Sequence, residues 1–93
     1  MIIGTATIKL YVPLVHSLKE KRMIVKSVIA KIQNKFNVSI AEVSEQDRLQ
    51  TIILGIACIT NTVRQADSII DHIIKFVENY SEIEILDIQR EMR

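Results

Sequence analysis

The chain has 93 residues, of which 48% are hydrophobic, and it contains only two glycines and one proline. A chain of this length forms one domain that buries roughly 60–65% of its unfolded surface, and so little Gly and Pro excludes long disordered linkers. No apolar run approaches the roughly 20 residues that span a bilayer, which argues against a transmembrane helix.

The net charge of +1 conceals an asymmetry along the chain. Residues 1–36 carry seven Lys or Arg and one acid, Glu20, whereas residues 37–93 carry five basic and ten acidic residues. The two parts therefore have net charges of +6 and −5. Such segregation predicts a directional electrostatic surface, suited to a charged partner, rather than general adhesion to nucleic acid.

The single cysteine and the N-terminal residues indicate the cellular compartment. The single cysteine, Cys58, cannot form an internal disulfide, which fits a reducing environment. The apolar N-terminal residues are interrupted by Thr5, Thr7 and Lys9 and have no basic region before them, so we expect no signal peptide. The sequence therefore predicts a cytoplasmic protein.

Residues 2–12 alternate with a period of two, which predicts a half-buried strand. One face would carry Ile2, Ala6, Ile8, Leu10 and Val12, and the other Ile3, Thr5, Thr7, Lys9 and Tyr11. Pro13 ends the strand because it cannot donate a ladder hydrogen bond.

Ser17-Leu18-Lys19-Glu20 is a capping box, in which the Ser17 hydroxyl accepts from the Glu20 N–H and the Glu20 carboxylate reaches back to the Ser17 N–H. A helix then runs to about Phe36. Its apolar stripe consists of Leu18, Val25, Val28, Ile29, Ile32 and Phe36. Lys19, Arg22 and Lys26 lie on one flank of this stripe, and Lys31 and Lys35 lie on the other.

Two strands are predicted next, over residues 38–43 and 49–59, joined by the polar turn 45–48. In the first of them the apolar positions change phase from Val38/Ile40 to Ala41/Val43, which indicates a bulge or a bend. The second is aliphatic on both faces, which places it in the middle of a sheet.

A second helix, capped by Asn61 or Thr62, is predicted to run to about Asn79, with a strand over 82–90 after it. Its buried stripe would be Val63, Ala66, Ile70, Ile73, Ile74 and Val77. The last strand changes phase between Ile85 and Leu86. The order β-α-β-β-α-β is the ferredoxin-like α+β fold. Right-handed crossovers give a four-stranded antiparallel sheet in the order 4-1-3-2, with two helices on one face and residues 1–93 as a single domain.

The residues indicate no reaction, so we expect no catalytic residue, no metal and no cofactor. Cys58 lies within a strand and is predicted to be a core residue. His72 falls on an exposed helix face, and His16 has no carboxylate nearby to orient it apart from Glu20, which the cap already uses. The acids Glu42, Glu45 and Asp47 are interpreted as a solvated turn rather than a cation site. The protein is therefore predicted not to be an enzyme.

Several segments together resemble the YlxP-like family of small bacterial proteins of unknown function. They are Ser17-Leu18-Lys19-Glu20-Lys21-Arg22, Phe36 to Val43 (Phe-Asn-Val-Ser-Ile-Ala-Glu-Val), Gln46-Asp47 and Leu54-Gly55-Ile56-Ala57. The resemblance covers essentially the whole chain and implies a ferredoxin-like fold. Genes of this family commonly lie beside those for translation initiation and small-subunit maturation, which implies a role near the ribosome. This chain departs from the family pattern at Leu49, often Trp, and at Thr51, commonly Arg.

Two functions remain open. The first is a binding module for RNA, with ribosomal RNA or the small ribosomal subunit as partner, whose phosphates are contacted by Lys19, Lys21, Arg22, Lys26, Lys31 and Lys35. The alternative is that these long side chains are only solvated on the helix flanks and have no binding role.

The second is a structural or regulatory homodimer, with no membrane partner, that uses the open sheet face and holds a small ligand between subunits. Its expected interface is Ile3, Thr5, Thr7, Tyr11 and Ile53, with Ile56 as the alternative to Ile53.

Overall fold

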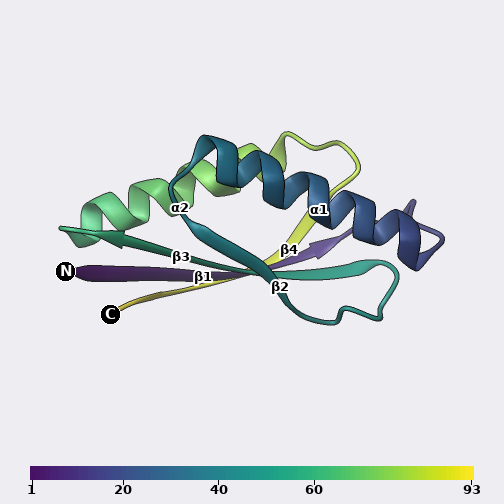
Figure 1. The fold of residues 1–93 in the computed structure, drawn as a ribbon, viewed down its shortest axis with the longest axis horizontal. Coiled ribbons are helices and arrows are strands. Elements are labelled where there is room, and N and C mark those ends of the chain that lie inside the picture. The colour runs from purple at the N-terminus through teal and green to yellow at the C-terminus, as the bar shows by residue number, and fades with distance from the viewer.

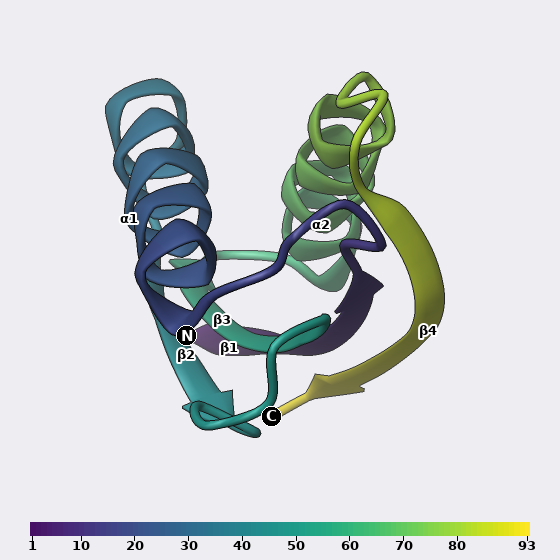
Figure 2. The same cartoon turned by 90° about the vertical axis from the view of Figure 1, so that its right-hand side faces the viewer.

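The computed structural model describes residues 1–93 and has six elements: β1 (Ile2–Tyr11), α1 (Leu18–Lys35), β2 (Ser39–Ser44), β3 (Thr51–Thr60), α2 (Val63–Glu78) and β4 (Glu84–Met92). All strand pairs are antiparallel, and their order is β2-β3-β1-β4. Both helices lie on one face of this sheet, as Figure 1 shows, and they diverge from each other in Figure 2. The predicted ferredoxin-like topology is confirmed.

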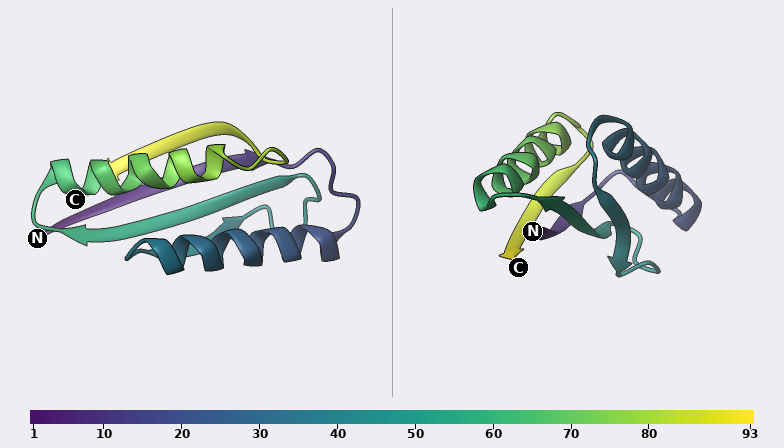
Figure 3. Two further views of the ribbon diagram at one scale, coloured as in Figure 1. Left: turned by 90° about the horizontal axis from the view of Figure 1, so that it is seen from above. Right: turned by 60° about the vertical axis from the view of Figure 1, so that its left-hand side comes forward.

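The core lies between the sheet and the two helices. α2 packs over the central strands β1 and β3, and α1 packs beside β2, an arrangement visible in both views of Figure 3. β1 gives Ala6, Ile8 and Leu10 to this core, and β3 gives Ile52, Leu54, Ile56 and Cys58. Ile56 is 3% exposed and faces the helices, so Ile53 is the residue on the open sheet face.

Both predicted changes of phase are β-bulges on edge strands. The register of β2 shifts between Glu42 and Ser44, and the register of β4 shifts opposite Lys9 and Leu10. The β4 bulge lets Ile85 and Ile88 both pack against the core, whereas Ala41 and Val43 of β2 stay exposed and do not join it.

The helix caps follow the sequence with one difference. The Ser17 hydroxyl accepts from the Glu20 N–H at 3.1 Å and Thr62 accepts likewise from Gln65. The Glu20 carboxylate, however, faces the Ser17 hydroxyl at 3.4 Å rather than the Ser17 N–H. The buried stripe of α2 is as predicted except for Val63, the first residue of the helix, which is 46% exposed.

Candidate functional site

Three cations on the outer side of α1 form a surface that we call the basic flank: Lys19, Arg22 and Lys26. At 100° per residue they lie on the side of the helix toward the β2 edge, and all three are exposed. None of them is in an ion pair with a carboxylate. The basic flank therefore presents three charges that the protein itself does not neutralise.

The basic flank begins at the N-terminus of α1, which adds to its positive charge. Lys19 lies in the first turn of α1, where the helix N-terminus already carries partial positive charge. Cations there cost helix stability instead of adding to it. The needs of the helix therefore do not explain the position of Lys19.

A groove runs between α1 and β2 beneath the basic flank. It has a volume of about 420 Å³ and is lined by Arg22, Val25, Lys26, Ile29, Ala30, Gln33 and Glu42. The floor is apolar and the rim carries the two cations. We call it the basic groove.

The other two predicted cations, Lys31 and Lys35, turn toward α2. The Lys31 ammonium lies 5.4 Å from the centroid of the Tyr80 ring, and that of Lys35 lies 5.1 Å from the Phe76 ring. Phe76 meets both Phe36 and Tyr80 edge to face. These lysines thus hold cation–π contacts at the seam between the helices, worth about 0.5–1 kcal/mol each at exposed sites, and they lie apart from the basic flank.

Lys21 differs most from the expectation, because it is 0% exposed. Its ammonium donates to the carbonyl of Glu45 at 2.6 Å and to that of Gln46 at 3.3 Å, and lies 3.1 Å from Glu42 Oε2. An ammonium held this way cannot reach an anion in solvent, so Lys21 serves the fold and is not part of the basic flank. Its spacing with Leu18, Val25 and Val28, inside the apolar stripe, is the signal that could have found it.

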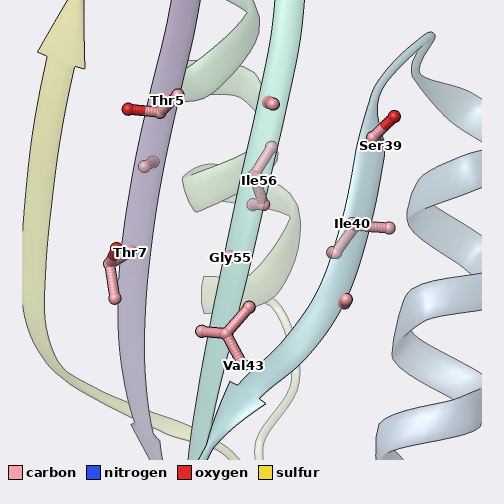
Figure 4. A pocket seen from close by; sticks show the side chains of 10 residues that line it. Thr5, Thr7, Ser39, Ile40, Val43, Gly55 and Ile56 are labelled. Atoms are coloured by element: carbon pink, nitrogen blue, oxygen red, sulfur yellow. The ribbon is translucent and has the colours of Figure 1, made fainter.

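The open sheet face holds the residues expected at an interface. Ile3, Thr5, Thr7, Tyr11 and Ile53 all lie on the side away from the helices. Figure 4 shows a pocket on this face, with a volume of about 380 Å³, lined by residues of β1, β3 and β2 that include Thr5, Thr7, Ser39 and Gly55. Ile59, beside Ile3 in the ladder, is 68% exposed.

The remaining chemically active side chains are dispersed. Cys58 is buried, His16 is exposed, and the Nδ1 of His72 lies 2.6 Å from the carbonyl of Ser68 on its own helix. No group of three or more His, Cys, Asp or Glu is arranged to hold a metal ion. Neither helix combines the length and the apolar character needed to cross a membrane.

Comparison with known proteins agrees with the fold and the sequence motifs. A family model described as a protein of unknown function, DUF503, matches residues 3–90. The chain belongs to the DUF503 family. It is also similar to the uncharacterized protein YlxP of Bacillus subtilis (strain 168), with 40% identity over 68 residues that cover 73% of this chain and 74% of YlxP. The resemblance drawn from Ser17–Arg22 and Phe36–Val43 is thereby confirmed.

The DUF503 chain shares its architecture with a de novo designed protein of ferredoxin fold. The two superpose with a TM-score of 0.56 over 100% of this chain and 86% of the design, at 21% identity. At that identity the likeness concerns the fold alone.

Proposed function

We propose that this protein is a non-catalytic binding module that contacts RNA, in the small ribosomal subunit, through the basic flank of α1. The observation that supports this is the exposure of Lys19, Arg22 and Lys26 without any carboxylate partner. The three side chains follow one side of the helix over about 10 Å, at a rise of 1.5 Å per residue. Contacts of this kind position a protein on phosphates without reading sequence.

Charge removal on the flank should weaken RNA binding and reduce its salt dependence. For single-stranded RNA each phosphate contact contributes about −0.7 to the slope of log affinity against log salt. The K19Q/R22Q/K26Q variant should therefore lose about 2 from that slope and bind about tenfold or more weakly at low salt. Fluorescence anisotropy with a labelled single-stranded segment of small-subunit ribosomal RNA measures both quantities.

The matched control removes three exposed cations elsewhere. Lys9, Arg64 and Lys75 are exposed and have no ion pair. The K9Q/R64Q/K75Q variant therefore has the same net charge as the flank variant. If both variants bind RNA with equal affinity, only net charge matters and the basic flank is not the site.

A second candidate function is a homodimer through the open sheet face, with the pocket beside Thr5 and Thr7 available to a small apolar ligand between subunits. The specific observation in its favour is the pair Ile3 and Ile59, adjacent in the ladder, with Ile59 68% exposed on a strand whose other residues are buried or half-buried. Adjoining apolar surface of this kind is typical of an interface.

An Ile59→Asp substitution should convert such a dimer to monomer, because it places a charge in an apolar contact. Sedimentation velocity at several concentrations measures the change. Leu14→Asp is the matched control, since Leu14 is 71% exposed and lies in the loop before α1. A wild-type chain that stays monomeric at high micromolar concentration argues against this dimer.

A further inference from the structure

A second groove lies on the opposite edge of the molecule. It runs between α2 and β4, has a volume of about 430 Å³ and is lined by Ile74, Glu78, Ile83, Glu84, Ile85 and Ile88. Like the basic groove it pairs an edge strand with a helix and has an apolar floor. We call it the acidic groove.

The two grooves carry opposite charge. Glu78 and Glu84 are exposed on the rim of the acidic groove, and neither carboxylate has a hydrogen bond or an ion pair. On the other edge, Arg22 and Lys26 are unpaired as well. Glu42, which also lines the basic groove, already faces the Lys21 ammonium. The acidic groove thus has two unpaired negative charges, and the basic groove has two unpaired positive charges.

The two grooves also lie at the same height on the sheet. Glu42 of β2 is opposite Leu54, Leu54 is opposite Ile8, and Ile8 is opposite Ile88 of β4. These four residues form one row across the sheet, which runs from the basic groove to the acidic groove. A copy displaced sideways along the sheet therefore brings its acidic groove level with the basic groove of its neighbour.

Strand direction permits the same displacement. Each neighbouring pair in the order β2-β3-β1-β4 is antiparallel, so β2 and β4 run in opposite directions. A β4 brought alongside the β2 of another copy would pair antiparallel. Figure 2 shows both helices of one copy on the same face of its sheet, so a sideways displacement keeps the helices of both copies on one side.

We propose that copies of this chain associate head to tail, with the α2–β4 edge of one copy against the α1–β2 edge of the next. Glu78 and Glu84 then face Arg22 and Lys26 of the neighbour, and the isoleucines of the acidic groove cover Val25 and Ile29. The bulges in β2 and β4 shorten the backbone ladder that the two edges can form. The joint is therefore weak and reversible, and it depends on the charges.

This contact is heterologous, so it leaves one free edge of each kind at the ends of the assembly. It also covers Arg22 and Lys26, two of the three cations of the basic flank. Association and RNA binding would consequently compete for the same side chains. The association itself needs no RNA and can be tested without it.

The experiment is sedimentation velocity of nucleic-acid-free protein over a range of concentrations, in salt of about 0.1 M and about 1 M, where the screening length is about 10 Å and 3 Å. We expect the average mass to rise with concentration at low salt and to fall back to monomer at high salt. The E78K/E84K variant and the R22E/K26E variant should each associate about tenfold or more weakly than wild type. An equimolar mixture of the two variants should regain association, since opposite charges face each other again.

The matched control is K9E/R64E, which reverses two exposed cations outside both grooves and both edge strands and should associate like wild type. Circular dichroism establishes that every variant is folded. Three results overturn the proposal: a wild-type monomer at all concentrations, association that both charge-reversal variants retain, or a mixture that fails to regain it. Since no RNA is present, none of these results bears on the RNA-binding proposal.

Discussion

Replacing Lys21 with methionine should lower the free energy of unfolding by about 3–5 kcal/mol, the usual cost of removing one partner from a buried ion pair. The substitution leaves Glu42, whose side chain is only 14% exposed, without its counter-charge. It also removes the donor that serves the carbonyls of Glu45 and Gln46. Since domains of this size lose about 4–8 °C in Tm for each kcal/mol, urea and thermal denaturation will both detect the change.

Two further variants separate the charge from the size of the side chain. K19M removes an exposed lysine two residues earlier in the same helix and should change stability by no more than about 0.5 kcal/mol. K21M/E42L replaces both charges with apolar groups and should recover most of the loss. It will stay about 1–2 kcal/mol below wild type, because the two carbonyls still lack a donor. Equal stability of K21M and wild type would show that the buried ion pair does not contribute to folding.

The fold could be predicted from the sequence because each element carries its own period. Alternation over residues 2–12, the Ser17 cap and the apolar stripe of α2 are local patterns, and the structure follows them. The β4 bulge was predictable for the same reason, since a change of phase in a half-buried strand must be absorbed by an extra residue. The β2 bulge falls later than the predicted change of phase, between Glu42 and Ser44.

What escaped prediction depends on tertiary contacts. The spacing of Lys21 places it in the apolar stripe of α1, but only the fold brings together the two carbonyls and the carboxylate that allow a lysine to be buried there. On β3 both faces are apolar, so periodicity alone leaves Ile53 and Ile56 equivalent. The register that sets Leu54 opposite Ile8 decides between them.

The two candidate sites also differ in whether local sequence patterns could predict them. The charge of the basic flank could be counted along one helix, because all three cations belong to it. The acidic groove could not be found in this way, since Ile74 and Glu78 come from α2 while Glu84 and Ile88 come from β4. Only the pairing of β4 with β1 brings them together.

Substituting Gly4 with alanine should lower the free energy of unfolding by about 1–3 kcal/mol, the range for overpacking a core. A Cβ at this position would lie 2.8 Å from the Cβ of Ala66 and 3.2 Å from the Cys58 Sγ. Ala66 is 0% exposed on α2 and has no side-chain torsion that could move its Cβ away. Gly4 has no positive φ, so the expected loss comes from space and not from backbone strain. Urea denaturation measures it.

Gly55 provides the contrast that tests this reasoning. A Cβ there would lie 2.7 Å from Val43 Cγ1, which is closer, yet Val43 is 53% exposed on a bulged edge strand and can turn outward. G55A should therefore cost less than G4A, because the lower entropy of the unfolded chain favours alanine equally at both positions, by about 0.4–1 kcal/mol, and only the clash differs.

The G4A/A66G double variant completes the test. Removing the Ala66 Cβ opens the space that a methyl group at position 4 needs, at a cost of about 1 kcal/mol for glycine inside a helix. The double variant should then be more stable than the sum of the two single changes predicts, by about 0.5–3 kcal/mol. Strict additivity would mean that the close approach of β1 to α2 does not limit the residue at position 4. The contact of Gly4 with Ala66 is what lets α2 lie close to the first rungs of the sheet.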